Sequence, residues 1–277
     1  IKKNILKKIN FYKIDLANKE KVKKFFKNKN FDLIIHLAAF SGVNEFNRNL
    51  LKSFNNNVLA TKNLVEFGFN KKNTKFIFAS SAAVYGKVTK KKVEEKDRCK
   101  PANYYGLSKV ACENIINQAL HKKKINYAIL RYFNVVGTLI DFPTEKKILS
   151  LFDRIKQNVK KRKYKINING NNFDTLDGTP ERDFIHIRDL CNIHLEVSKY
   201  LKKNKKIVLN CGSGFKYSVL KVVKEFERKI KRRFNISYKL INSDETQTIC
   251  SDMKLLKKEL KTKIMIYKLN DLVKDYL

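Results

Sequence analysis

The regular alternation of two kinds of segment is the feature that most limits how this chain can fold. Short apolar runs rich in β-branched and aromatic residues are separated by longer amphipathic stretches, a pattern typical of βαβ units on a parallel sheet. The sequence therefore predicts an α/β fold with a doubly wound parallel sheet. The predicted strands span Asn10 to Asp15, Leu33 to Ala38, Lys75 to Ser81, Tyr127 to Phe133 and Ile207 to Cys211. The predicted helices span Lys19 to Lys27, Leu51 to Phe67, Tyr105 to His121 and Leu190 to Leu201, and a further helix is expected after its N-cap Ser218.

The alternation becomes irregular after Asn134, where turns and short segments occupy 137–147 and 169–183. We expect a smaller α/β lobe in this part of the chain. Residues 1–135 are then the first domain, to which 183–212 return, and 136–277 form mainly the second lobe. No Pro-rich or Ser-rich linker separates the two, so they are expected to share a cleft, the usual ligand site in such folds.

The formal net charge of +35, taken alone, favours a polyanionic partner such as nucleic acid. The lysines, however, are spread through nearly every segment, and no RNA-binding aromatic signature accompanies them. A basic coat on the solvated faces explains them better, and we expect no specific nucleic-acid partner. No apolar run approaches the roughly 18 residues that span a bilayer, and the N-terminus lacks the apolar core of a secretory signal. We therefore expect a cytoplasmic protein without a membrane partner.

The cysteines and histidines do not have the spacing of a disulfide framework or a metal site. Five cysteines are scattered and never form a Cys-x-x-Cys pair, and the four histidines are equally dispersed. An odd number of isolated cysteines argues against both disulfide pairing and zinc binding. We expect no metal.

The sharpest chemical signal is the segment Tyr105 to Lys109, which follows Ser81 by about one βα unit. Residues four apart on a helix project from the same face. A phenol has a pKa of about 10 and is a poor base at neutral pH, but a nearby ammonium favours the phenolate. A Tyr and a Lys at this spacing are common. Together with a strand-terminal Ser that could hold a substrate oxygen, they indicate hydride-transfer chemistry.

Five longer segments have a characteristic order and spacing. They are FIFASSAAVYG (76–86), YYGLSK (104–109), LRYFNVVG (130–137), DGTPERDFIHIRDL (177–190) and NCGSGFKYSVLKVV (210–223). In these segments the chain resembles UDP-glucose 4-epimerases of the extended short-chain dehydrogenase/reductase family, from about Asp15 almost to Leu277. The resemblance implies a Rossmann-like domain with a smaller substrate lobe. It also implies epimerisation at C4 of a UDP-hexose, UDP-glucose or UDP-galactose, by transient hydride transfer to bound NAD.

The resemblance implies a role for individual residues. Tyr105 would be the base that takes the proton from the sugar 4-hydroxyl, with Lys109 and Ser81 as its catalytic partners. NAD would be held by Asp15, Leu16, Leu37, Ala38, Ala39, Phe40, Ser41, Asn57, Tyr105, Lys109 and Phe133. The UDP-sugar would contact Ser81, Asn134, Leu151, Asn169 and the diphosphate-binding Arg182. The family also implies a homodimer.

Several of these positions have a simpler structural explanation when each is taken alone. Ala38 and Ala39 could allow a strand to pack closely on a helix, Asn57 could lie on a helix surface, and Arg182 could pair with Asp183 or Asp189. Taken in register along the whole chain, the functional assignment is favoured.

The chain also departs from the family pattern. Ser41 replaces a usual Lys, Ser150 replaces a usual Asn, Asn242 to Glu245 replace a segment with a second Arg, and the position that sizes the sugar pocket falls at Ile249 or Cys250. The missing second Arg argues against normal UDP affinity, and the sugar stays open between a hexose, an N-acetylhexosamine and another nucleotide sugar.

The nine glycines form no Gly-x-Gly-x-x-Gly or Gly-x-x-Gly-x-x-Gly turn, the element that binds the pyrophosphate in a dinucleotide fold. The first segment matches the family's third strand, so we expect these 277 residues to lack the first two strands and the Gly-rich loop. In the strand order 3-2-1-4-5-6 this leaves a gap between the strands near Ile14 and Ile35. Residues 1–277 alone are therefore expected to be inactive and unable to hold NAD tightly.

Other functions are compatible with parts of the pattern. A sugar-nucleotide 4,6-dehydratase needs an additional acid and base beside the strand-end hydroxyl, whereas Ala82 and Ala83 follow Ser81. Another NAD-dependent nucleotide-sugar epimerase, or a non-catalytic binding protein on a degenerate scaffold, would fit the lost Arg. A nucleic-acid-binding protein would show steeply salt-dependent affinity that uridine nucleotides do not compete away.

Overall fold

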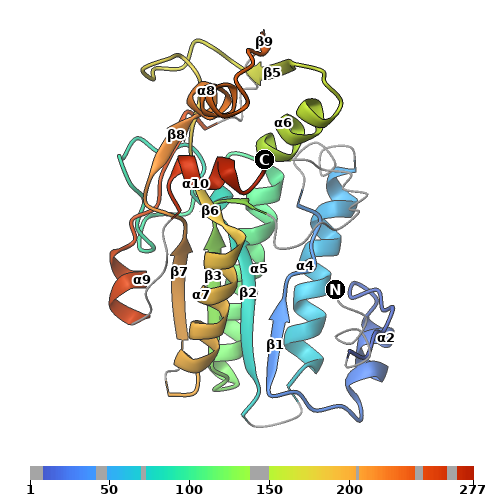
Figure 1. Ribbon diagram of the computed structural model, residues 1–277. Coiled ribbons are helices and arrows are strands. Elements are labelled where there is room, and N and C mark those ends of the chain that lie inside the picture. Colours follow the sequence, from blue (N-terminus) through green and yellow to red (C-terminus); the bar gives the residue numbers. More distant parts are fainter. Residues whose placement is uncertain are drawn as a thin grey trace.

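The computed structural model describes residues 9–41, 49–69, 73–137, 150–203, 206–240, 246–260 and 267–277. In Figure 1 a sheet with helices on its faces forms one part of the molecule, and a smaller lobe lies beyond the carboxyl ends of its strands. The helices are α2 (Lys19–Phe26), α4 (Leu50–Phe67), the 3-10 turn η1 (Ala82–Tyr85), α5 (Tyr104–Lys122), α6 (Leu151–Lys160), α7 (Ile187–Tyr200), α8 (Val219–Ile230), α9 (Lys254–Glu259) and α10 (Leu269–Lys274). The strands are β1 (Leu33–His36), β2 (Lys75–Ser81), β3 (Tyr127–Tyr132), β4 (Asn134–Val136), β5 (Lys165–Asn169), β6 (Glu181–His186), β7 (Lys206–Cys211), β8 (Lys216–Ser218), β9 (Asn235–Lys239) and β10 (Thr248–Ile249).

The main sheet consists of parallel strands in the order β1-β2-β3-β7. Successive side chains of a strand point to opposite faces. Ile77 and Leu130 pack on one face with side chains of α7 and α9. Phe76 and Ile129 pack on the other face with side chains of α4 and α5. Helices therefore cover both faces, and the predicted α/β, doubly wound arrangement is confirmed.

The smaller lobe has its own core, in which α6, α8 and α10 pack with the paired strands β5 and β9. The ring centroid of Phe152 lies 5.5 Å from that of Phe226 and 5.2 Å from that of Tyr276. Ser150 and Asp153 form a capping box at the start of α6. As predicted, Ser218 caps α8, where its side chain accepts from the backbone N–H of Lys221. The lobe thus buries apolar faces independently of the main sheet.

Strand β6 connects the two parts of the molecule. It pairs with β4, which follows β3 almost directly, and with β8, which follows β7. It also pairs with the short strand β10. The carboxyl edge of the main sheet therefore continues into the strands that support the smaller lobe, and the predicted site residues lie around this junction.

Most predicted elements form near their expected bounds, but the predicted strand Asn10 to Asp15 is wrong. Residues 9–15 have no regular secondary structure. A strand needs a hydrogen-bonded neighbour, and within the described ranges β1 pairs with β2 alone. Tyr12 instead packs edge-on against Phe25, with ring centroids 5.0 Å apart. The apolar pattern of this segment serves packing on α2 rather than a sheet.

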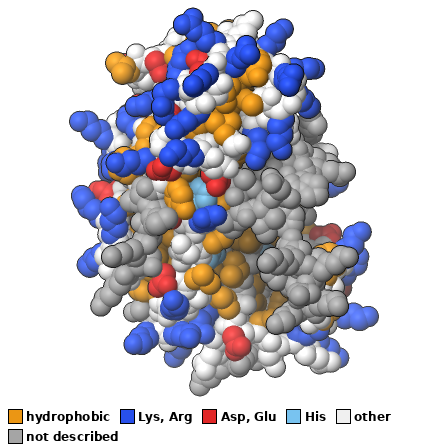
Figure 2. All heavy atoms as spheres, in the orientation of Figure 1, with side chains coloured by type: hydrophobic (Ala, Val, Ile, Leu, Met, Phe, Trp, Pro, Cys, Tyr) orange, Lys and Arg blue, Asp and Glu red, His pale blue; other side chains and the backbone are white. Residues whose placement is uncertain are grey.

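The basic side chains form a dispersed coat. Figure 2 shows Lys and Arg spread over the visible face rather than gathered in one patch. Some of them pair locally along α8, as Lys224 does with Glu227 and Arg228 with Glu225, and exposed pairs of this kind contribute little to stability. Among the helices of the described part, none is long and apolar enough to cross a membrane.

Candidate active site

The end of β2 and the start of α5 bring Ser81 and Tyr105 together. The side chain of Asn103 caps α5 by accepting from the backbone N–H of Gly106 at 2.8 Å. Gly106 approaches the strand end so closely that a Cβ there would lie 2.5 Å from the carbonyl oxygen of Ala83. This close approach places Tyr105 within reach of Ser81, and a side-chain hydrogen bond joins the two.

Burial dominates the ionisation of Tyr105. It raises the pKa of the phenol, and the hydrogen bond with Ser81 opposes that rise. The Lys109 Nζ lies 5.9 Å from the centroid of the Tyr105 ring. The sequence predicted that Lys109 would depress the pKa of Tyr105, whereas in the structure the net shift is upward. The physical reason is that desolvation of the phenolate outweighs the stabilising contacts.

Lys109 is buried below Tyr105, on the same face of α5. Its Nζ donates to the carbonyl oxygen of Ala79 at 2.8 Å and lies 4.7 Å from the centroid of the Phe78 ring. Burial lowers the pKa of Lys109 to about 8, and the neighbouring Cys112 and Glu113 oppose this shift. At neutral pH the amine is therefore mostly protonated, yet close to its midpoint.

The loop 37–41 follows β1 at the same carboxyl edge and is held from behind by Asn57 of α4. Its first residue, Leu37, is 61% exposed. Asn57 Oδ1 accepts from the N–H of Phe40 at 2.8 Å, while Nδ2 donates to the Phe40 carbonyl at 3.1 Å and to Ser108 Oγ at 3.2 Å. Asn57 is only 2% exposed, so its explanation as a helix-surface residue is wrong. It ties the loop to α5.

Asp15 and Leu16 lie in the turn that leads into α2. Asp15 Oδ1 accepts from the N–H of Ala17 at 3.0 Å. The carbonyl of Leu16 accepts from Asn63 Nδ2 of α4 at 2.9 Å. The turn is therefore fixed against α4, on the side of the sheet where the cofactor residues were predicted.

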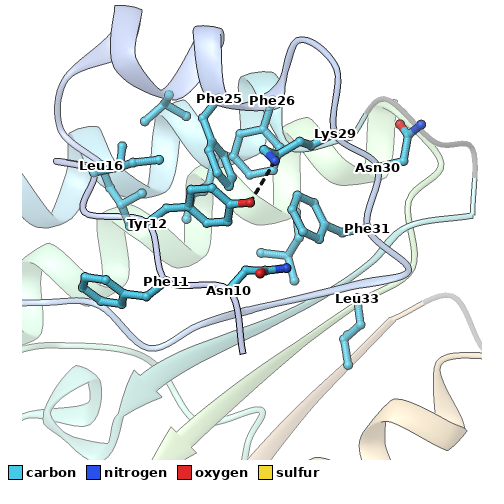
Figure 3. A pocket seen from close by; sticks show the side chains of 14 residues that line it. Asn10, Phe11, Tyr12, Leu16, Phe25, Phe26, Lys29, Asn30, Phe31 and Leu33 are labelled. Atoms are coloured by element: carbon cyan, nitrogen blue, oxygen red, sulfur yellow. Dashed lines mark hydrogen bonds between the residues drawn. The ribbon is translucent and has the colours of Figure 1, made fainter. Parts of the chain in front are cut away.

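A pocket of about 700 Å³ lies next to this turn and is lined by residues of α2, β1 and the segment before α2, among them Leu16. Figure 3 shows Tyr12, Phe25 and Phe31 around it, with Lys29 Nζ donating to Tyr12 Oη at 3.2 Å. The predicted catalytic residues do not line this pocket. The pocket is lined mainly by apolar side chains, and among its described lining residues Leu16 belongs to the predicted cofactor site.

Arg182 lies on β6, the strand that joins the two parts of the molecule. Its Nη1 donates to the carbonyl oxygens of Glu181 at 2.9 Å and Gln247 at 3.2 Å. In the strand ladders it is opposite Ile249 of β10 and Tyr217 of β8. The guanidinium is therefore anchored to backbone at the junction and is half-buried there.

Asp183 organises the same junction, a role that the sequence did not reveal. It is fully buried, and one carboxylate oxygen accepts from the N–H and the Oγ of Ser213, both at 2.7 Å. The other oxygen accepts from the N–H groups of Gly214 at 3.1 Å and Ser251 at 3.0 Å, and from Ser251 Oγ at 2.6 Å. These bonds fix β6 to the segments after β7 and β10, and with them the backbone of Arg182. The only sequence signal was its place beside Arg182.

The other predicted contacts lie around the junction or farther out. Phe133 is buried at the end of β3, and Asn134 is exposed at the start of β4. Leu151 begins α6 and packs against the core of the smaller lobe. Asn169 is exposed at the end of β5. Their contacts with a cofactor or a sugar stay predictions.

Two departures from the family pattern concern the nucleotide sugar, one the sugar pocket and the other the UDP. Ile249 is 8% exposed and packs in a cluster with Ala82 and Phe133, and Cys250 is buried beside it. The segment 242–245, where the second Arg was expected, lies outside the described residues.

Comparisons with known proteins show which family the chain resembles. The model of the NAD dependent epimerase/dehydratase family matches residues 2–212. The UDP-glucose 4-epimerase of Drosophila melanogaster is 33% identical over 265 residues, which cover 92% of this chain and 75% of that protein. The UDP-glucose 4-epimerase of Yersinia enterocolitica is 36% identical over 228 residues, covering 80% of this chain and 68% of that protein.

Solved structures share the fold. That of UDP-glucose 4-epimerase from Bifidobacterium longum, in complex with NAD⁺ and UDP, superposes with a TM-score of 0.87 at 27% identity, over 96% of this chain and 81% of that one. That from Stenotrophomonas maltophila, with bound NAD and formylated UDP-arabinopyranose, gives a TM-score of 0.86 at 25% identity over the same shares. From its fold, its match over residues 2–212 and these relatives, the chain belongs to the NAD dependent epimerase/dehydratase family, as an extended short-chain dehydrogenase/reductase.

Proposed function

We propose that the protein interconverts UDP-glucose and UDP-galactose by epimerisation at C4, with NAD as its cofactor. One observation carries the proposal: the hydrogen-bonded pair of Ser81 and Tyr105 lies above the buried Lys109 at the carboxyl edge of a parallel sheet. Ligands of open α/β sheets bind at that edge. The two relatives that are 33% and 36% identical to this chain are named UDP-glucose 4-epimerases.

In this proposal Tyr105 moves the proton. Its Oη takes a proton from the 4-hydroxyl of the sugar and gives it back when the sugar has turned over. The hydroxyl of Ser81 holds the same sugar oxygen in place. Because burial raises the pKa of Tyr105, its deprotonation depends on these contacts and on the ammonium of Lys109. NAD, when bound, supplies the oxidation and re-reduction at C4.

The residues at this edge fit a nicotinamide dinucleotide. The loop 37–41 presents the exposed Leu37 and is held rigidly by Asn57, so its backbone is available to a flat, polar ligand. Lys109 offers a buried cation beside it, which suits a ribose hydroxyl. We assign the adenine end to the turn at Asp15 and Leu16, and the junction of cofactor and sugar to Phe133.

In this proposal the two lobes bind different ligands. We propose that residues 1–135, together with 183–212, bind NAD, because β7 pairs with β3 and α7 covers the main sheet. Residues 136–277 bind mainly the nucleotide sugar, with Arg182 on the diphosphate. The homodimer expected for the family stays a prediction, which light scattering of the purified protein would test.

The direct test is to incubate the natural protein with UDP-galactose and excess NAD and to separate the products by chromatography. We expect UDP-glucose, and UDP-galactose from UDP-glucose in the reverse reaction. A 4-keto-6-deoxy product would identify a dehydratase instead. No conversion of either sugar, with NAD bound, would contradict the proposal.

Replacing Ser81 with Ala should lower kcat only about tenfold, because Tyr105 remains and a single hydrogen bond to the sugar oxygen is worth roughly 1.4 kcal/mol. The variant is compared with the wild-type protein in steady-state assays with UDP-galactose. A loss as large as that of a Tyr105 variant would mean that Ser81 itself moves the proton.

Replacing Asn57 with Ala should weaken NAD binding about fivefold, because the loop at Phe40 loses its anchor and must be ordered by the cofactor, at a cost on the order of 1 kcal/mol. NAD affinity is measured by calorimetry. Asn55→Ala is the matched control, because Asn55 is exposed on the same helix and should leave the affinity unchanged. Equal affinity in both variants would show that Asn57 serves packing alone.

A further inference from the structure

Three consecutive residues at the end of β2 contact three successive turns of α5. The contacts, taken along the strand, are Ala79 with Lys109, Ser80 with Glu113 and Ser81 with Tyr105. The three helix residues are four apart and so lie on one face of α5. The outer contacts belong to the catalytic residues already described. The middle contact, at 2.5 Å between Ser80 Oγ and Glu113 Oε1, has no role in the proposed reaction.

Glu113 also binds β3 through a buried ion pair. Its two oxygens accept from Arg131 Nε at 3.1 Å and Nη2 at 2.8 Å, and the side chains of Glu113 and Arg131 are 6% and 7% exposed. Arg131 Nη1 donates in addition to Tyr85 Oη and to the Glu95 carbonyl, both at 2.9 Å. A single carboxylate therefore joins α5 to the ends of both β2 and β3, and a bidentate pair of this kind fixes orientation as well as distance.

We propose that Glu113 is the positioning residue of this site: it holds α5 in register with the end of β2, so that Tyr105 meets Ser81. The inference rests on the proposed function and adds a residue to it. Glu113 touches neither sugar nor cofactor in the proposed reaction. Without its carboxylate, α5 can shift along β2, and the contact between Tyr105 and Ser81 loosens while the substrate lobe is unaffected.

The charge of Glu113 acts on the site as well. The titratable groups that face Lys109 in the described structure are His36 of β1, Tyr105, Cys112 and Glu113 of α5 and, behind Glu113, Arg131 of β3. Burial lowers the pKa of His36 to about 3 and raises that of the Cys112 thiol, so both are neutral at pH 7. Cys112 and Glu113 both oppose the lowering of the Lys109 pKa by burial, and of the two Glu113 is the ion-paired carboxylate.

The test is Glu113→Gln in the natural protein. Because the proton-transfer geometry is lost but the sugar still binds, we expect kcat for UDP-galactose to fall roughly tenfold, with KM changed by less than about twofold. We also expect the pH midpoint of Lys109 to fall below that of the wild-type protein. Isotope-labelled lysine followed by NMR measures it, and the Lys109→Arg spectrum identifies the signal. Wild-type kcat, or an unmoved Lys109 midpoint, overturns the inference.

The single variant leaves Arg131 buried without its partner and can fail to fold for that reason. The double variant Glu113→Gln with Arg131→Gln removes both charges and restores a neutral pair. If Glu113 only neutralises Arg131, the double variant regains wild-type kcat, and the inference is wrong. If Glu113 positions Tyr105, the roughly tenfold loss of kcat persists in the folded double variant, whereas the Lys109 midpoint returns toward the wild-type value because both charges are gone.

Glu227→Gln is the matched control, because Glu227 is also an ion-paired helix carboxylate, on α8, and accepts from the N–H of Phe234. It should change neither kcat nor the Lys109 midpoint. The two readouts also separate this inference from the proposed function. If the wild-type protein converts no UDP-hexose, the proposed function falls, and the Lys109 titration in Glu113→Gln still decides the role of Glu113.

Discussion

Tyr105→Phe is expected to abolish measurable epimerisation, with kcat reduced by about 10²- to 10⁴-fold. The substitution removes the hydroxyl that shares a hydrogen bond with the Ser81 side chain at the carboxyl edge of the sheet and leaves the ring in place. Because the ring packing is kept, NAD and UDP should bind as they do to the wild-type protein. The measurement is steady-state conversion of UDP-galactose, with cofactor content read from the absorbance of the purified variant.

Tyr104→Phe is the matched control for this prediction. Tyr104 is the neighbouring residue on α5 but is 51% exposed, so loss of its hydroxyl should leave kcat unchanged. A Tyr105→Phe protein that keeps near wild-type turnover would overturn the assignment of Tyr105 as the base. A protein that loses NAD along with its activity would point to a cofactor-binding role instead.

Arg182→Ala is expected to weaken binding of UDP by about 2 kcal/mol or more, roughly thirtyfold in the dissociation constant, because a diphosphate loses a charge-assisted partner. Calorimetric titration with UDP measures the change. The backbone around Arg182 is fixed by Asp183 and its five hydrogen bonds from Ser213, Gly214 and Ser251. The strand should therefore keep its position when the side chain is truncated.

Arg188→Ala is the control, because Arg188 is exposed at the start of α7, a few residues along the chain. It removes the same charge from the protein without touching β6, and UDP affinity should not change. If Arg182→Ala leaves UDP affinity intact, the guanidinium serves only to brace the Glu181 and Gln247 carbonyls. If both variants weaken binding equally, the effect comes from the general field of this basic protein.

The sequence predicted the parts of the fold whose pattern is set locally. Strand β2 and the cap at Ser218 agree with their predicted bounds because apolar runs and N-caps are read from neighbouring residues. The segment at Asn10 has the same apolar character, but forming a strand depends on a neighbour in space, which no local pattern reveals. Helix α6 and strand β5 were missed because they lie in the region where the alternation is irregular.

Of the candidate site, the sequence predicted only the arrangement that local helix geometry sets. Tyr105 and Lys109 are four apart on one helix, so their common face follows from helix geometry alone. The hydrogen bonds of Asn57 to the loop at Phe40, and those of Asp183 to Ser251, join residues on different elements of the fold. Such contacts depend on tertiary packing, which no local pattern reveals. No feature of the sequence predicted that Asp183 would organise the junction.

The contacts that join α5 to β2 and β3 span short stretches of the chain. Lys109 and Glu113 meet β2 across separations of 30 and 33 residues, and Arg131 meets Glu113 across 18. The contact of Arg182 with Gln247 spans 65. Closing a short loop costs less entropy than closing a long one. The unit of β2, α5 and β3 should therefore acquire its native contacts early, so Tyr105 and Ser81 are aligned before strand β6, which carries Arg182, has its neighbours in place.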